Sequence, residues 1–100
     1  MSDFDHDDLS VEDHAEARRY EARLGSDVVG FIAYHSEPGR ITLLHTEVDP
    51  AFEGKGFGSR LIGGTLDDIH SRGLSVVPVC RFVRAYLERH PEYSSIVATR

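Results

Sequence analysis

The sequence has few of the residues that build disulfide frameworks, metal centres and membrane spans. Cys80 is the only cysteine, which excludes an intrachain disulfide and a cysteine-based zinc site. The six histidines are scattered, with no pair at the helical spacing of metal ligands, so we expect no metal cofactor. No run of about eighteen apolar residues occurs, so we expect no transmembrane helix. Together these absences favour a reduced, cytoplasmic protein.

Basic residues are missing from the first sixteen positions. This stretch, MSDFDHDDLSVEDHAE, holds seven acidic side chains, and all eleven lysines and arginines follow it. It lacks an apolar h-region, so we expect it not to be a signal peptide. Such acidic runs are usually solvated tails, so we predict a flexible acidic leader over residues 1–13 and one domain over residues 14–100. Because the leader repels phosphates, we expect no nucleic acid partner, and we expect a monomer that does not bind membranes.

The apolar pattern of the first half predicts an antiparallel β-meander. Alternating, β-branched and aromatic residues indicate strands over residues 17–24, 28–35 and 41–48. Only the tripeptide Gly-Ser-Asp separates the first two strands. Pro38 and Gly39 have the spacing of a type II turn between the second and third strands.

The second half changes to a helical period. Apolar residues recur at helical spacing after residue 60, and Gly73 is placed to end that helix. Residues 74–80 read as a fourth strand, in which Pro78 indicates an edge or a bulge. A short helix over residues 82–87 stops at His90-Pro91, and residues 93–100 suggest a last short strand. The crossover makes the third and fourth strands parallel, so the predicted fold class is α+β (mixed α/β).

The stretch EGKGFGSRL has three glycines at alternate positions just before the first helix. It matches neither the nucleotide P-loop, G-x-x-x-x-G-K-[ST], nor the dinucleotide pattern G-x-G-x-x-G. Two interpretations remain open. The loop is either a plain β-to-α turn or an anion site, in which free amides and the helix dipole meet a phosphate.

The stretch FEGKGFGSRLI resembles the coenzyme A pyrophosphate loop of the GCN5-related N-acetyltransferases (GNAT family), whose signature is Q/R-x-x-G-x-G/A. Glu53, Gly56 and Gly58 occupy the signature positions. Two longer stretches, GRITLLHTEVDPAFEGKGFGSRLI and LSVVPVCRFVRAYLERHPEY, resemble small single-domain members similar to N-acetyltransferase domain-containing protein 1 and the YjdJ-like proteins. The resemblance runs from about His14 to Val97.

This resemblance implies a truncated GNAT-like fold and acetyl-CoA as the acyl donor. The third strand would pair with the pantetheine arm, the loop amides would hold the pyrophosphate, and Lys55 and Arg60 would add positive charge. The implied coenzyme-binding residues are Val48, Glu53, Gly54, Lys55, Gly56, Phe57, Gly58, Ser59 and Arg60.

Three residues are candidates for catalysis: Cys80, His45 and Glu47. Cys80 opens the second helix, whose N-terminus favours a thiolate, but a lone cysteine is also commonly a small buried hydrophobe. His45 is a candidate general base or a histidine held by a backbone hydrogen bond. Glu47, two residues on, lies on the same strand face; it could orient His45, accept a proton, or be a solvated charge. Tyr86 lies near the place of a thiolate-protonating tyrosine in larger relatives, but its spacing favours a core role.

The predicted function is transfer of an acetyl group from acetyl-CoA to an unidentified amine or protein acceptor. The transfer is either direct, with His45 as base, or by way of an acetylated Cys80. The alternative is a non-catalytic acyl-CoA-binding or partner-interaction module, because the short Gly-Ser-Asp connection leaves nothing obvious to enclose a small acceptor.

Overall fold

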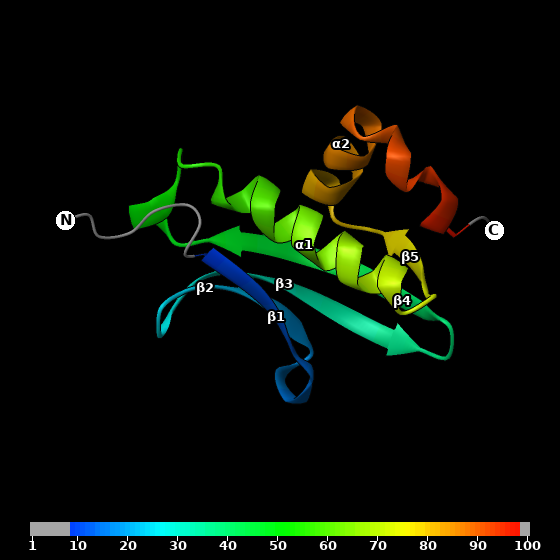
Figure 1. Ribbon diagram of the computed structural model, residues 1–100, viewed down its shortest axis with the longest axis horizontal. Coiled ribbons are helices and arrows are strands. Elements are labelled where there is room, and N and C mark those ends of the chain that lie inside the picture. Colours follow the sequence, from blue (N-terminus) through cyan, green and yellow to red (C-terminus); the bar gives the residue numbers. More distant parts are fainter. Residues whose placement is uncertain (1–8, 99–100) are drawn as a thin grey trace.

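The computed structural model describes residues 9–98, which form one five-stranded sheet with two α-helices (Figure 1). The strands lie in chain order and are β1 (Leu9–His14), β2 (Arg19–Leu24), β3 (Asp27–Glu37), β4 (Arg40–Val48) and β5 (Ser75–Pro78). Helix α1 (Phe57–Ser71) packs across all five strands, and α2 (Arg81–Arg89) packs on β4, β5 and α1. Short 3-10 turns η2 (Ala15–Ala17), η3 (Pro50–Phe52) and η4 (Pro91–Ile96) complete the chain.

The meander and the crossover that the sequence predicts are confirmed. The three predicted antiparallel strands, β2, β3 and β4, are joined by tight turns. Gly39 has the positive φ of 79° that the type II turn requires. β4 and β5, which precede and follow α1 in the chain, pair in parallel. Gly73, at φ 71°, follows the end of α1. The fold is thus an α+β fold with the meander, crossover and C-terminal helix that the sequence resemblance implies.

The prediction of a last strand over residues 93–100 is wrong for the part that the structure describes. Pro91 opens a 3-10 turn, η4, which runs to Ile96. Proline suits the first position of such a turn, since its missing N–H needs no partner there. Only Val97 returns to the sheet, in an isolated parallel bridge with Val76.

The predicted boundary of the acidic leader is also wrong. Residues 9–13 belong to β1, which pairs with β2 along its whole length. Leu9 is buried in the core and Val11 packs against it, so two apolar side chains at alternate positions give the strand a core face despite its acidic neighbours. Residues 1–8 of the predicted leader lie outside the described part of the chain.

The glycine pair in α1 permits two close contacts. A Cβ on Gly64 would come within 2.8 Å of the Val11 side chain on β1, and a Cβ on Gly63 within 2.7 Å of the Tyr86 hydroxyl on α2. Both distances are shorter than any normal carbon contact. The glycines, which lower helix propensity, therefore allow α1 to approach both the sheet and α2.

A polar network ties the last turn of α1 to the sheet. The Tyr20 hydroxyl donates to Asp68 at 2.5 Å, the Tyr34 hydroxyl donates to Asp13 at 2.6 Å, and the Arg72 guanidinium contacts both carboxylates at 3.2 Å. Burial, then the neighbouring carboxylates, raise the pKa of both tyrosines, that of Tyr34 to about 12. Both phenols therefore remain hydrogen-bond donors at neutral pH, and the network joins β1, β2, β3 and α1.

Glu21 is a buried carboxylate on the sheet face that points away from α1. It is 1% exposed and is surrounded by Arg19 at 2.8 Å, Arg23 at 2.8 Å and His14 at 3.0 Å. Burial by itself would raise the pKa of Glu21, but its contacts with His14, Arg19 and Arg23 outweigh burial and lower the pKa to about 2.

We predict a stability loss in acid that depends on Glu21. Because its folded pKa is lowered, its contribution is complete above the ordinary value of 4.5 and is lost as the pH falls toward about 2. Urea unfolding at pH 6, 4 and 3 should show Glu21→Gln less stable than wild type at pH 6, with the difference shrinking in acid. Glu37→Gln, which removes an exposed carboxylate, should show little difference at any of these pH values. A constant deficit for Glu21→Gln would contradict this account.

Candidate active site at the gap between β4 and β5

The two parallel strands separate halfway along β4. β5 pairs with β4 only from Arg40 to Leu43. At that point Leu44 is an extra residue in the β3–β4 ladder, and such a bulge bends and twists its strand. Pro78, opposite Leu43, has no N–H to continue the ladder. The segment 44–48 therefore has no strand on its outer edge among residues 9–98.

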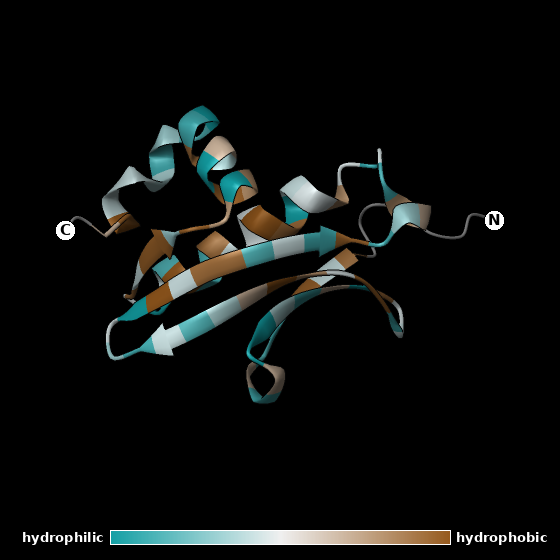
Figure 2. Cartoon of the chain, turned by 180° about the vertical axis from the view of Figure 1, so that it is seen from behind, coloured by the Kyte–Doolittle hydropathy of each residue, from teal (hydrophilic) through white to brown (hydrophobic). Residues whose placement is uncertain are grey.

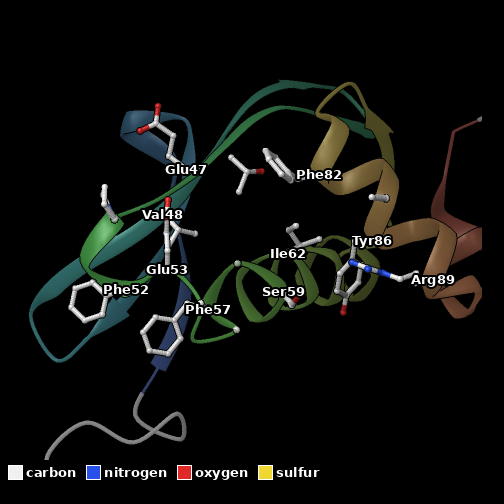
Figure 3. A pocket seen from close by; sticks show the side chains of 16 residues that line it. Glu47, Val48, Phe52, Glu53, Phe57, Ser59, Ile62, Phe82, Tyr86 and Arg89 are labelled. Atoms are coloured by element: carbon white, nitrogen blue, oxygen red, sulfur yellow. The ribbon is translucent and has the colours of Figure 1, made fainter.

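A pocket of about 620 Å³ lies beside this gap (Figure 3). It lies between the end of β4, the glycine loop, the first turns of α1 and the exposed side of α2. Its walls combine apolar and aromatic side chains with backbone groups of the loop. The lining residues are Thr46, Glu47, Val48, Pro50, Phe52, Glu53, Gly54, Gly56, Phe57, Gly58, Ser59, Ile62, Phe82, Ala85, Tyr86 and Arg89.

The glycine loop presents backbone rather than side chains to this pocket. Gly54 and Gly56 have φ values of 82° and 80°, and nothing lies within 4 Å of where their Cβ atoms would be. Gly56 is the N-cap of α1 and offers no side chain to the first amides of the helix. The backbone of the first turn of α1 and the positive end of the helix dipole therefore border the pocket, as an anion site requires.

Seven of the nine predicted coenzyme-binding residues line the pocket: Val48, Glu53, Gly54, Gly56, Phe57, Gly58 and Ser59. Lys55 and Arg60 are not among its lining residues. Arg60 borders a neighbouring pocket of about 530 Å³ on the other side of Tyr86. Phe82 and Arg89 also line the pocket, although the sequence analysis did not predict them as site residues. Their spacing with Tyr86, at i, i+4 and i+7 on one helix face, is the signal that could have found them.

His45 and Glu47 form a pair on the sheet face that points away from α1, which we call the open face. Tyr20 faces α1 because its hydroxyl bonds Asp68, and strand pairing places Ile32 and then Thr46 on that same face. Their neighbours therefore face the other way. His45 Nε2 lies 2.7 Å from Glu47 Oε2, and both side chains are more than half exposed. Figure 3 shows Glu47 pointing away from Ser59 and Ile62.

Cys80 lies on the helix side of the sheet. It is the N-cap of α2 and is 5% exposed, and its Sγ is 3.2 Å from Thr46 Oγ1. The structure therefore brings Cys80 together with Thr46 and brings His45 together with Glu47. It places the two pairs on opposite faces of β4, which meet at the gap.

Tyr86 has the core role that its helical spacing favours. Its hydroxyl is directed at Gly63 of α1 and hydrogen-bonds Tyr93. Its ring stacks on His90, with centroids 4.0 Å apart. Burial, then the charges of Asp67 and Glu92, raise the pKa of this phenol, so it stays neutral at ordinary pH. Tyr86 separates the two pockets and supports the α1–α2 packing.

None of the helices within residues 9–98 is long and apolar enough to cross a membrane. In the same part of the chain, no group of three or more histidine, cysteine or acidic side chains is arranged to hold a metal ion.

Comparisons with known proteins agree with this geometry. The family model for GCN5-related N-acetyltransferases matches residues 19–96. No curated protein matches the chain. Among solved structures, a GCN5-like protein from Staphylococcus aureus is 20% identical, with a TM-score of 0.68 over 93% of this chain and 91% of that one.

Two longer proteins share the fold. The ribosomal-protein-S18-alanine N-acetyltransferase of Escherichia coli is 19% identical, with a TM-score of 0.60 over 72% of this chain and 51% of that one. Ard1 from Thermoplasma volcanium is 22% identical, with a TM-score of 0.58 over 78% of this chain and 57% of that one. The chain thus spans about half the length of these two proteins. At these identities the likeness to solved structures shows the fold alone. The family model covers most of the chain, so this protein belongs to the GCN5-related N-acetyltransferase family.

Proposed function

We propose that the protein transfers an acetyl group from acetyl-CoA directly to an amine, with His45 and Glu47 as the base. The observation that supports this most is the gap between β4 and β5. A sheet normally separates its two faces, but here the pocket on the helix side and the His45–Glu47 pair on the open face border the same gap. A donor held on one side could therefore be attacked from the other.

The pocket residues fit acetyl-CoA. The backbone of Gly58 and Ser59 in the first turn of α1 and the open glycines 54 and 56 suit a pyrophosphate, which needs contact with the backbone and favours a helix N-terminus. The unpaired outer edge of β4 over residues 44–48 suits the amides of the pantetheine arm, which can pair with a strand. Apolar side chains such as Ile62 and Phe82 line the pocket beside them.

His45 and Glu47 would prepare the acceptor. The contact between Nε2 of His45 and Glu47 holds the imidazole in place, and a positioned imidazole can accept a proton from an amine. The amine nitrogen loses a proton to this pair and attacks the thioester carbonyl. The carbon–sulfur bond breaks, and the departing thiolate takes up a proton from water. The products are the acetylated amine and coenzyme A.

Transfer by way of Cys80 is the second candidate route, because Cys80 is the N-cap of α2 and lies beside the gap. In that route the thiolate takes the acetyl group first. The structure favours direct transfer, since Cys80 is buried against Thr46 and the His45–Glu47 pair lies on the other face.

We predict that His45→Ala lowers kcat by about a hundredfold, as expected for loss of a general base. Glu47→Gln, which changes the partner of that base, should lower kcat by a smaller factor. Both variants should leave acetyl-CoA affinity unchanged. Cys80→Ala should keep most of the activity. The sequence contains a matched control, because His35 and Glu37 form the same His-x-Glu pair on β3, 3.7 Å apart. His35→Ala should leave turnover unchanged.

Turnover of acetyl-CoA with a panel of amines and peptides, together with intact-mass analysis, would separate the alternatives. An acetyl adduct that hydroxylamine removes and Cys80→Ser prevents would establish the cysteine route instead. Tight acetyl-CoA binding with no turnover for any acceptor would favour the non-catalytic module.

A further inference from the structure

We infer that a row of side chains across the open face recognises the acceptor as a polypeptide with an acidic side chain close to its reacting amine. This inference rests on the proposed function, because it assigns the acceptor side of the same site. The row consists of Arg19, Ala33 and His45, which strand pairing places side by side on β2, β3 and β4. We call these three residues the acceptor row.

The acceptor row has a cation at one end and the proposed base at the other. Neighbouring strands are about 4.8 Å apart, so the backbones of Arg19 and His45 are about 10 Å apart. Ala33, between them, contributes a single carbon. The adjacent row on the same face consists of Glu21, Phe31 and Glu47.

Phe31 contacts both ends of the acceptor row. The Arg19 guanidinium lies 4.6 Å from the centroid of the Phe31 ring, and the His45 ring meets the same ring edge-on at 6.3 Å. Arg19 also donates from Nε to the buried Glu21. Both ends are open to an acceptor, because the Arg19 side chain is 34% exposed and that of His45 is 58% exposed.

The charges at the two ends of the acceptor row complement an amine and a carboxylate. Glu47 beside His45 favours an incoming ammonium group, and Arg19 favours an anion. In an extended peptide, side chains two residues apart lie on the same face about 7 Å apart. An amino terminus at His45 therefore brings the side chain of the third residue within reach of Arg19.

The shape of this face favours a polypeptide over a small acceptor. Small-molecule sites are usually enclosed, whereas Arg19, Ala33 and His45 line neither of the two pockets described above. The turn between β2 and β3 consists of only two residues, so no insertion lies between these strands. Leu44 and Val79, at the edge of the gap, are 44% and 52% exposed and extend the surface available to a peptide. Figure 2 shows β3 and β4 from behind, with the helices on the far side.

The test uses two seven-residue peptides with free amino termini that differ only in glutamate or glutamine at the third position. Binding is measured by fluorescence anisotropy with coenzyme A present, and acetylation by mass spectrometry. The wild-type protein should prefer the glutamate peptide by about fivefold, the upper range for a partly exposed ion pair. Arg19→Gln should abolish this preference.

Arg23→Gln is the matched control, because Arg23 also bonds Glu21 but lies outside the acceptor row. The Arg23→Gln protein should keep the fivefold preference for the glutamate peptide over the glutamine peptide, even if the substitution destabilises the fold. Equal binding and equal acetylation of the two peptides by the wild type, or a ratio that Arg19→Gln does not change, would overturn the inference without affecting the proposed reaction. Arg19-dependent preference without acetylation would support the recognition and refute the reaction.

Discussion

Replacing Gly58 with valine should nearly abolish acetyl-CoA binding while leaving the fold intact. Gly58 lies in the first turn of α1 with ordinary helical angles, and an added Cβ would meet only the Val48 side chain at 3.6 Å, a normal contact. The new methyl groups would, however, occupy the pocket wall where we place a phosphate. We expect acetyl-CoA affinity to fall by about a hundredfold or more, equivalent to about 2.8 kcal/mol. The free energy of unfolding should change by less than about 1 kcal/mol.

Calorimetric titration with acetyl-CoA and thermal unfolding of the same samples would check this expectation. His70→Val places the same side chain on an exposed position in the last turn of α1 and should leave affinity unchanged. A second matched pair uses backbone strain. Gly56 and Gly39 have nearly equal positive φ values and equally open surroundings, so alanine should destabilise both, but only Gly56→Ala should also weaken binding. A folded Gly58→Val protein with normal affinity would rule out the pyrophosphate assignment.

Deleting residues 1–12 should severely destabilise the domain, contrary to what the acidic composition of this segment suggests. The deletion removes Leu9, which is 8% exposed, and Val11, which packs on Gly64, together with most of the β1–β2 ladder. Burial of two such side chains is worth about 3–5 kcal/mol. In a domain of this size, 1 kcal/mol corresponds to about 4–8 °C in Tm, so we expect Tm to fall by more than about 12 °C.

A shorter deletion separates the strand from the acidic charge that precedes it. Deleting residues 1–8 removes four of the acidic side chains and none of the described contacts, so we expect Tm to change by only a few degrees. Val11→Asp in the full chain should lower Tm nearly as much as the longer deletion, since it places a charge against α1. Equal Tm values for the two deletions would show that β1 contributes nothing to stability.

The order of most elements, and the glycine loop that borders the pocket, could be predicted from the sequence because both depend on local chemistry. Apolar periodicity distinguishes the strands from α1 and α2, and Pro38, Gly39, Gly73 and Pro91 mark turns through their own backbone limits. The loop at Gly54 and Gly56 needs backbone conformations that glycine adopts readily. These features need no knowledge of distant neighbours.

Other features depend on contacts between residues far apart in the chain. The strand at Leu9 and Val11 forms because α1, with Gly64 at the contact, covers those two side chains, and acidic composition alone does not reveal this. The sequence places His45, Glu47 and Cys80 near one another in the site, but only strand pairing and the bulge at Leu44 decide which faces they occupy. A one-residue change of register reverses the face of every side chain. The two-residue spacing by itself pairs Glu47 with His45, whereas tertiary structure decided the partner of Cys80 and the face that each candidate catalytic residue occupies.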